Sequence, residues 1–326
     1  MTLMRLLFGR PSFRPLLPFL VGWRMSGVLC ASVAFAESTP IPPISVVVTL
    51  PALADFVRQV GGNAVQVHSL ISSISDEHTY HPKPSDLQIL QQARLLVKIG
   101  LGLEDWLDGL LQNTSRADRV VVTASDGIPL IRDRGVLRNG DGDTGRPFKE
   151  RQTQGNVHIW LDPENAKAMA RQIADGLIRV DPGHRKDYLR RQSEYFQTLD
   201  RLTAEIKQKM AALPDRKIVT YHPAWPYFAR RFGLSIRGEI FTQEGAELSP
   251  KQLVRLVNRM RKERVRIIVS EPHLDGKVPQ ALAAETGARI VALSSQPGAL
   301  PGTSTYVDLI RHNAHVLISA LESARP

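Results

Sequence analysis

Short apolar strands alternate with amphipathic helices twice along this chain, and the repeated alternation limits the folds that the chain can form. In the first half, apolar runs such as ISVVVTL and RLLVKIG are separated by helical patterns such as LADFVRQVGG. The alternation returns after residue 216, from KIVTYH to the closing YVDLIRHNAHVLISAL. Strands that alternate with helices are typical of parallel sheets covered by helices. We therefore expect an α/β fold of two similar lobes, each a mostly parallel sheet flanked by helices.

The segment between the two halves predicts how the lobes are joined. Residues 126–156 are polar and rich in glycine, which favours a flexible surface loop. Two helical patterns follow, and the second carries an apolar stripe that ends before Pro214. We predict a long helix at 184–213 that joins an N-terminal lobe at 37–183 to a C-terminal lobe at 214–326.

The N-terminal segment has the pattern of a secretory signal. Residues 1–36 contain arginines and no acid, with the apolar runs LLPFLVGW and MSGVLCASVAFA. The small-x-small pattern AFA suits a signal peptidase, so we predict a signal peptide cleaved after Ala36 and a mature protein in the periplasm. An uncleaved membrane anchor is the alternative. A lipoprotein anchor is not expected, because Leu29 precedes Cys30 where a small residue is needed.

Composition limits the chemistry of any site. The single cysteine, Cys30, leaves with the signal peptide, so a metal site in the mature chain must use His, Asp and Glu. The formal net charge is +10, but without the four arginines of the signal there are 38 basic residues against 32 acidic ones. These positive charges are spread along helix faces rather than clustered in a patch with interleaved aromatics, so nucleic-acid binding is not expected.

Three of the nine histidines lie near the ends of predicted strands or loops, in both halves of the chain. His78 lies in SDEHTYHPKPSD, a loop stiffened by two prolines; His158 lies in NVHIWLDP; and His222 ends the strand KIVTYH. Ligands of parallel sheets bind beyond the carboxyl ends of strands, so these imidazoles can converge between the lobes. Zn²⁺ commonly takes three nitrogen ligands and one oxygen, which Glu77 can supply. The spacing matches no short zinc motif, so scattered loop histidines remain the alternative.

Three long segments give the chain its resemblance to a known family. EHTYHPKPSDLQILQQARLLVKIGLGLEDWL, VHIWLDPENAKAMARQIADGL and YHPAWPYFARRFGL occur in family order. Over essentially the whole chain after the signal, the sequence resembles the zinc- and manganese-specific solute-binding proteins of bacterial ABC transporters. The resemblance implies a metal bound in the cleft by His78, His158 and His222, and imidazole at position 222 is similar to the zinc branch. It also implies a membrane permease with its ATPase as partners, and we expect a monomer.

One departure from the family pattern leaves the fourth ligand open. Ser294 stands where the family often has an aspartate, and a neutral hydroxyl is a poor zinc ligand. Glu77 or water is the favoured fourth ligand, and His273 is a further candidate. His81 is expected to lie at the surface or to support the ligands, and the loop at 126–156 has no histidine for collecting metal.

Two residues near the site are expected to have structural roles. Asp162 is expected to cap the helix that begins at Pro163, and its carboxylate can also orient a histidine ligand. Glu104 is expected to be a loop residue rather than part of the chemistry.

Three other functions remain to be weighed against a zinc carrier. Three histidines and water also describe a catalytic zinc site, so a zinc-dependent hydrolase with Glu77 as base is one alternative. No nucleophile motif such as GxSxG supports it. A manganese-specific member of the same family is the second alternative, and a surface adhesion protein is the third. We predict a periplasmic carrier that binds Zn²⁺ and is not an enzyme.

Overall fold

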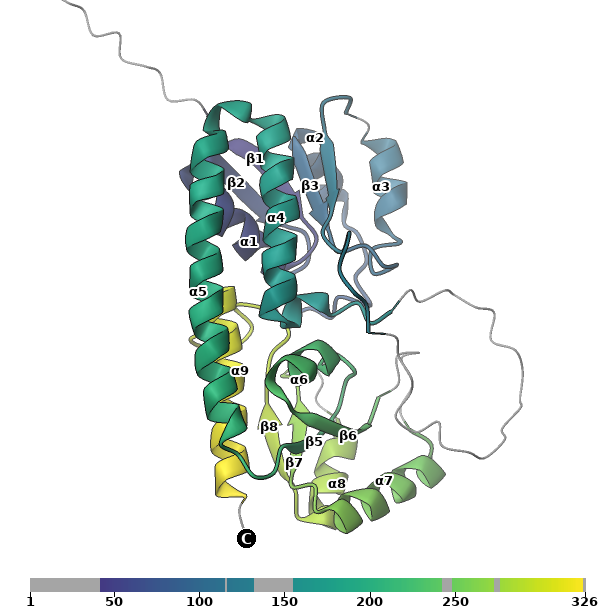
Figure 1. Cartoon of the computed structure of the whole chain (residues 1–326). Helices are drawn as coiled ribbons and strands as arrows, with labels where there is room; N and C mark the ends of the chain where they lie inside the picture. Colours follow the sequence, from purple (N-terminus) through teal and green to yellow (C-terminus); the bar gives the residue numbers. More distant parts are fainter. Residues whose placement is uncertain (1–41, 115, 132–154, 242–247, 273–275, 325–326) are drawn as a thin grey trace, which may run out of the picture. The chain divides into compact units, whose positions relative to one another are not determined.

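A computed structural model describes residues 42–114, 116–131, 155–241, 248–272 and 276–324 (Figure 1). From Pro42 onward the chain forms one compact unit. The predicted signal peptide, most of the predicted loop at 126–156 and His273 lie outside the described residues. Within the described ranges, no helix is long and apolar enough to cross a membrane.

The N-terminal lobe is built on a parallel sheet with the strand order β2-β1-β3-β4. Its strands are β1 (Ile44–Val48), β2 (Val65–Ser69), β3 (Leu95–Lys98) and β4 (Val120–Thr123). Its helices are α1 (Pro51–Gly61), α2 (Pro84–Gln92), α3 (Leu107–Asn113) and α4 (Pro163–Val180). Because side chains alternate along a strand, Val46 and Val48 pack in one cluster with α1 and α4, while Val47 packs in another with α2 and α3. Both faces of the sheet are therefore covered.

The C-terminal lobe repeats this plan with the order β6-β5-β7-β8, again all parallel. Its strands are β5 (Lys217–Thr220), β6 (Ser235–Glu239), β7 (Ile267–Ser270) and β8 (Arg289–Ala292). Its helices are α6 (Pro226–Phe232), α7 (Pro250–Glu263), α8 (Lys277–Thr286) and α9 (Tyr306–Ser323). Two lobes of similar topology confirm the fold class that the alternating pattern predicts.

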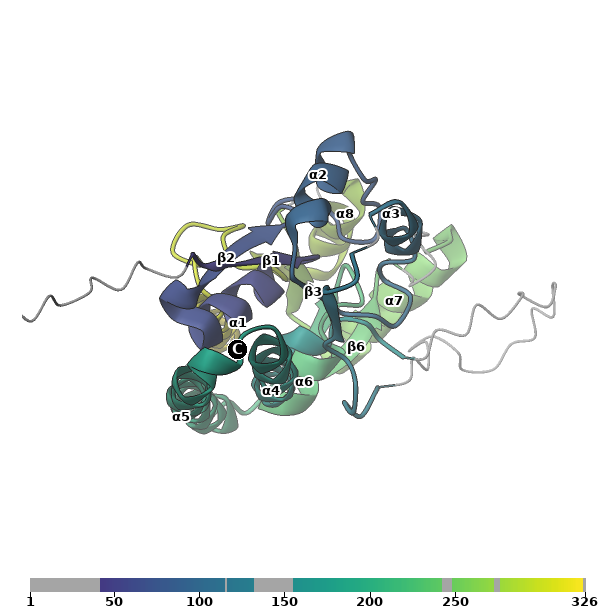
Figure 2. The same ribbon diagram turned by 90° about the horizontal axis from the view of Figure 1, so that it is seen from above.

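A helix of 27 residues, α5 (Arg185–Ala211), runs past both lobes (Figure 1). It packs on α1 and α4 of the N-terminal lobe and on α6 and α9 of the C-terminal lobe. Figure 2 shows α4 and α5 side by side, next to α1. The predicted apolar stripe is its buried face: Tyr188, Tyr195, Leu199, Leu202 and Ile206. Short 3₁₀ turns occur at Gly62–Ala64 (η1), Ile159–Leu161 (η2) and Pro182–His184 (η3).

Buried polar contacts connect the two lobes. Asp162 caps α4 as predicted, since its side chain accepts from the backbone N–H of Glu164 at 2.9 Å. Its carboxylate also accepts two hydrogen bonds from Arg231 of α6, at 2.6 and 2.9 Å. The hydrogen bonds of the Asp162 carboxylate among the described residues therefore go to the helix start and to the other lobe rather than to a histidine. The indole N–H of Trp160 adds a second connection, to the carbonyl of Ser295 at 2.8 Å.

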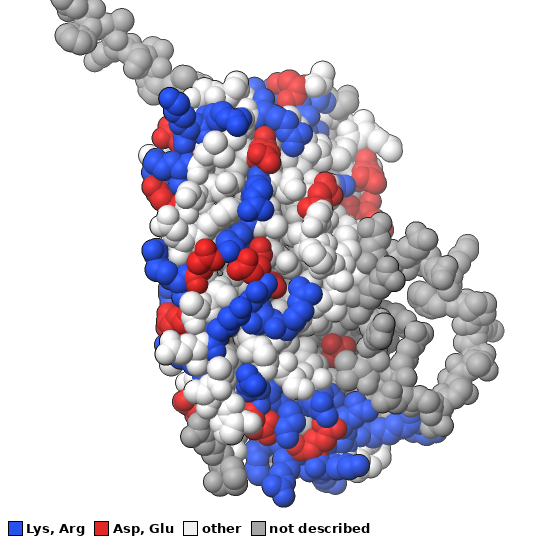
Figure 3. Space-filling model, in the orientation of Figure 1, with Lys and Arg blue, Asp and Glu red and all other residues white. Residues whose placement is uncertain are grey.

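Charged side chains are distributed over much of the face shown in Figure 3, where blue and red groups mix on the upper part and blue groups gather lower down. Many of the charges are paired with each other, such as Lys167 with Asp200 and Lys209 with Glu205, both at 2.6 Å. Such exposed pairs contribute little to stability, so the face is mainly a solvated surface.

Candidate metal centre

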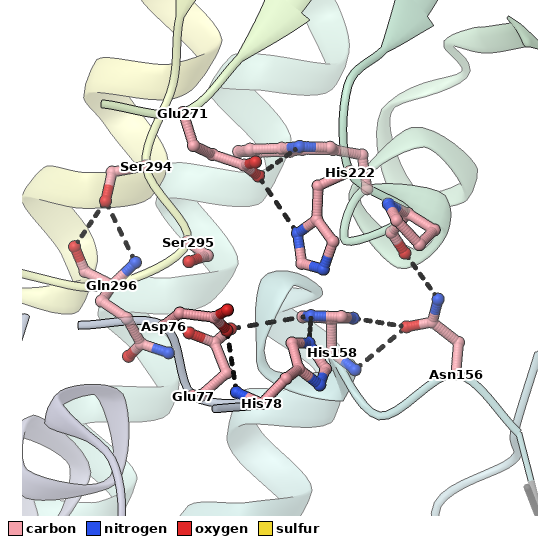
Figure 4. Close-up of polar contacts among 12 residues, drawn as sticks. Asp76, Glu77, His78, Asn156, His158, His222, Glu271, Ser294, Ser295 and Gln296 are labelled. Carbon is pink, nitrogen blue, oxygen red and sulfur yellow. Dashed lines mark hydrogen bonds and ion pairs between the residues drawn. The ribbon is translucent and has the colours of Figure 1, made fainter. Parts of the chain in front are cut away.

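Three loops bring three histidines to one point between the lobes. His78 lies in the loop between β2 and α2, His158 directly precedes η2, and His222 follows β5. One ring nitrogen from each lies within 4.8 Å of the other two, and the Nε2 atoms of His78 and His158 are 3.1 Å apart. The ring centroids are 4.7 to 5.3 Å apart. Figure 4 shows the three rings turned toward one another.

The loop that carries His78 is shaped by local hydrogen bonds. Asp76 Oδ1 accepts from the backbone N–H of His78 at 2.8 Å, an arrangement in which an aspartate closes a turn two residues on. Pro84 then takes the first helical position of α2, where its missing N–H costs nothing. The expected stiff turn is therefore present, and it ends directly in a helix.

The three histidines differ in exposure. His158 is almost fully buried, His222 is partly buried, and His78 is exposed to solvent. The cluster is thus closed on the side of His158 and accessible from the side of His78.

Asn156 fixes the ring of His158. Its Oδ1 accepts from the backbone N–H of His158 at 3.0 Å and lies 3.1 Å from the ring Nδ1. Its Nδ2 donates to the carbonyl of Pro223 at 2.7 Å, which fixes the orientation of the amide. Because an amide oxygen only accepts, Nδ1 of His158 carries the proton. The lone pair of Nε2 therefore faces the other two histidines.

A buried carboxylate, Glu77, completes the surroundings of the cluster. Its Oε1 lies 3.6 Å from Nε2 of His158 and has no hydrogen-bond partner among the described residues. Glu77 is 2% exposed, and this burial raises its pKa to about 7. The ionised form of a carboxylate that has lost its water in this way is strongly stabilised by a nearby cation.

The histidine pKa values are shifted by the same surroundings. Burial lowers the pKa of His158 well below its usual range, and the positive charges that His222 and His78 carry when protonated lower it further. Burial also lowers the pKa of His222, but the carboxylate of Glu271, together with the negative charges of Glu77 and Asp76, outweighs burial and raises the pKa above its usual value. His158 is therefore neutral at neutral pH, which is the form that binds a metal.

The donor set suits a divalent cation. Three imidazole nitrogens face one point, and a carboxylate oxygen lies beside them. For Zn²⁺ with nitrogen ligands at about 2.0–2.1 Å in a tetrahedron, neighbouring nitrogens are roughly 3.3 Å apart. The 3.1 Å between the Nε2 atoms of His78 and His158 is close to that spacing.

The remaining predicted candidates have other positions. Ser294 is buried, and its hydroxyl is occupied inside its own loop, donating to the carbonyl of Gln296 at 2.9 Å and accepting from its N–H at 3.1 Å (Figure 4). His81 is exposed. His273 lies outside the described residues. The carboxylate of Glu104 accepts from Thr49 and from two backbone N–H groups at 2.8 Å each, so it shapes its loop as expected.

Sequence reasoning missed two residues of this site, Asn156 and Glu271. Asn156 stands two residues before His158, a spacing at which asparagine commonly bonds the backbone, and this signal was available. Glu271 follows β7, the neighbour of β5 in the sheet, so its proximity to His222 depends on a strand order that the sequence does not state.

Comparison with known proteins points to one family. Residues 46–320 match the sequence profile of the ZnuA family, described as zinc-uptake complex component A, periplasmic. A protein from Treponema pallidum (strain Nichols) is 30% identical over 306 residues, which cover 91% of this chain and 94% of that protein. The manganese ABC transporter substrate-binding lipoprotein PsaA of Streptococcus pneumoniae serotype 4 is 29% identical over 274 residues, covering 81% of this chain and 84% of PsaA.

A solved structure agrees with the sequence comparison. The crystal structure of a zinc-bound ZnuA deletion mutant is similar with a TM-score of 0.74 and 29% identity, and the match covers 87% of this chain and all of that chain (100%). The residues matched by the family profile, 46–320, span both lobes and contain all three histidines.

Proposed function

Since this chain belongs to the ZnuA family of periplasmic zinc-uptake components, we propose that it captures Zn²⁺ between its lobes and delivers it to the permease of an ABC importer. Family members of this kind are substrate-binding proteins of ABC transporters and not enzymes. The observation that carries the proposal is the convergence of His78, His158 and His222, with one ring nitrogen from each within 4.8 Å. The ion is the cargo, bound and passed on unchanged.

The nature of the ligands favours zinc. Imidazole nitrogen suits Zn²⁺, whereas Mn²⁺ prefers oxygen from carboxylate, carbonyl or water. We propose His78, His158 and His222 as three ligands and Glu77 as the fourth, because Glu77 Oε1 is buried, unpaired among the described residues and 3.6 Å from Nε2 of His158. One carboxylate and three neutral imidazoles leave a net charge of +1 with a bound divalent cation.

Manganese is the alternative cargo. The PsaA relative is named as a manganese-binding protein, and another relative, YfeA of Yersinia pestis, is named as an iron-binding protein. These names show that proteins of related sequence bind different metals. The alternative would require more oxygen ligands than Glu77 and water at the cluster.

The family also suggests where and with what the protein works. Relatives are substrate-binding components of ABC transporters, which supports a membrane permease and its ATPase as partners. We propose that residues 1–36 are a signal peptide, that the protein acts in the periplasm as a monomer, and that the segments 37–183 and 214–326 each contribute ligands. His78 comes from the first segment, and His222 from the second.

A metal competition titration tests the proposal. The chelator-treated protein is titrated with Zn²⁺ and Mn²⁺ against a fluorescent chelator, alongside the variants His78→Ala, His158→Ala and His222→Ala. We expect one Zn²⁺ per chain that excess Mn²⁺ does not displace, and a large loss of affinity in each variant. His68→Ala is the matched control, because His68 is exposed on β2 and away from the cluster.

Three results would overturn the proposal in part or in full. Displacement of zinc by stoichiometric manganese would favour the manganese alternative. Tight zinc binding that survives all three substitutions would mean that the ion is held elsewhere. Turnover of ester or phosphate substrates by the zinc-loaded protein would contradict the carrier function altogether.

A further inference from the structure

A buried glutamate, Glu271, lies directly behind His222. It follows β7, at the edge of the sheet where the neighbouring strand β5 leads to His222. Its side chain is fully buried, at 0% exposure, and its Oε1 accepts from the indole N–H of Trp225 at 2.9 Å. The same Oε1 lies 3.6 Å from Nδ1 of His222 (Figure 4). Trp225 is itself buried at the start of α6, so a buried indole anchors the carboxylate that lies beside the histidine.

Two atoms of this pair lack a hydrogen-bond partner among the described residues. They are Nδ1 of His222 and Oε2 of Glu271. An unpaired buried polar group is costly, and a protonated Nδ1 that turns toward the carboxylate would satisfy the histidine. The distance of 3.6 Å is longer than a hydrogen bond, so Nδ1 has to move a few tenths of an ångström, about 0.4 Å or more, toward the carboxylate to form one.

We propose that Glu271 is a positioning residue for His222: it holds the imidazole with its proton on Nδ1 and directs Nε2, strengthened by the negative charge behind the ring, to the metal. A carboxylate behind a histidine ligand fixes the tautomer and raises the basicity of the ligand nitrogen. The inference rests on the proposed function, in which His222 binds the cargo ion.

The other buried histidine has a different support. Nδ1 of His158 faces the neutral amide oxygen of Asn156 at 3.1 Å, whereas Nδ1 of His222 faces an anion. A neutral acceptor orients the ring but adds little charge to it, and a carboxylate does both. We therefore expect His222 to be the strongest nitrogen ligand, and Glu271 to affect binding through that ligand alone.

The variant Glu271→Gln tests the proposal, because it keeps the size of the side chain and an acceptor for Trp225 while removing the charge. We expect zinc affinity to fall by about 10–100-fold with one site retained. Glu104→Gln is the matched control, since Glu104 is also a buried carboxylate after a strand, and its bonds go to Thr49 and backbone N–H groups. The control is expected to keep wild-type zinc affinity in the folded protein.

A double-mutant cycle separates positioning from general structure. Glu271→Gln is introduced into wild type and into His222→Ala, and zinc affinity is measured in all four proteins. If Glu271 acts through His222, it causes no further loss once the ring is absent. An equal loss in both backgrounds, or no loss in either, would overturn the inference.

The tautomer of His222 can be read without metal. In the full-length metal-free protein, ¹⁵N NMR should report a proton on Nδ1 of His222 in wild type and a mixture of tautomers in Glu271→Gln. A proton on Nε2 in wild type would overturn this inference. By contrast, zinc affinity that is unaffected by His222→Ala would overturn the proposed function, so the two failures are distinguishable.

Discussion

Replacing Glu77 with glutamine should stabilise the metal-free protein and weaken its metal binding. The folded protein raises the pKa of Glu77 from 4.5 to about 7, mainly by burial. At pH 8 the group is ionised in both the folded and the unfolded state, and the rise corresponds to about 3 kcal/mol of lost stability. The side chain is 2% exposed, so solvent screens little of this cost.

The effect has a defined pH dependence. Because the folded pKa lies above the unfolded one, the folded state binds more protons between pH 4.5 and about 7, and stability falls as pH rises through that range. Glu77→Gln removes this fall but leaves a buried amide that has lost its water, at a cost of about 1–2 kcal/mol. We expect a net gain of about 1–2 kcal/mol at pH 8 that reaches zero at about pH 5–6 and becomes a small loss at lower pH.

Thermal and denaturant unfolding of the metal-free protein at several pH values would measure this gain. For a chain of this size, the Tm at pH 8 should rise by roughly 2–5 °C. The control is Glu322→Gln in α9, because Glu322 is exposed to solvent. This variant should leave the pH dependence of the unfolding free energy unchanged. A variant Glu77→Gln no more stable than wild type at pH 8 would refute the assignment of Glu77 as a destabilising buried anion.

The same variant should lose zinc affinity. A carboxylate beside the ion supplies charge that an amide cannot, so we expect a loss of about 10-fold or more. Calorimetry in buffers of different ionisation enthalpy should also show that wild type releases more protons than Glu77→Gln on binding zinc at pH 6. Equal proton release would mean that Glu77 keeps its proton and is not a ligand.

Three further substitutions have expected outcomes. Arg231→Met removes the two hydrogen bonds that the fully buried Asp162 accepts from the other lobe and leaves it, among the described residues, only the Glu164 N–H and the more distant Arg230, at 3.7 Å, so it should cost about 3 kcal/mol in denaturant unfolding; an unchanged midpoint would contradict this role. Ser294→Asp places a charge where the hydroxyl bonds Gln296, so the Tm should fall by the equivalent of at least about 2 kcal/mol with no gain in metal affinity. Thr305→Ala removes the side-chain cap of α9 and should lower the free energy of unfolding by about 1 kcal/mol in denaturant titration. Metal affinity should stay unchanged in this variant.

The fold was largely predictable from the sequence because its elements have strong local patterns. The apolar stripe from Tyr188 to Ile206 recurs at helical spacing and is the buried face of α5. Strands such as β1 are apolar at nearly every position, with Ser45 as the one polar residue of β1, which is the pattern of a strand covered on both faces. Strand order has no such local pattern, since it depends on how the crossovers pack.

Helix starts were less predictable than helix existence. Within SDLQILQQA, Ser85 has the character of an N-cap, but α2 begins at Pro84 with Lys83 as its cap residue. The carboxylate of Asp86 accepts the backbone N–H of Lys83 at 2.7 Å, so the acid inside the first turn does the capping. Such reciprocal contacts shift a boundary by one or two residues without changing the pattern that predicts the helix.

The three histidines of the candidate site could be predicted from the sequence, but the residues that hold their rings in place could not. The pattern that predicts the site is the position of three histidines near the ends of predicted strands or loops: His78, His158 and His222. The loops that follow parallel strands lie at one edge of the sheet, where ligands bind. The carboxylate behind His222 comes from another strand, and the guanidinium that bonds Asp162 comes from another lobe. These contacts are set by packing between elements, which the sequence alone does not specify.

The central claim is that one ion is bound jointly by His78, His158 and His222. A crystal structure of the zinc-loaded protein, with anomalous data collected on both sides of the zinc absorption edge, tests it most directly. We predict a single zinc peak about 2.0–2.1 Å from one ring nitrogen of each histidine, with an oxygen of Glu77 or water as the fourth ligand. A zinc peak away from this cluster, or a cluster without zinc at saturating metal, would contradict the account.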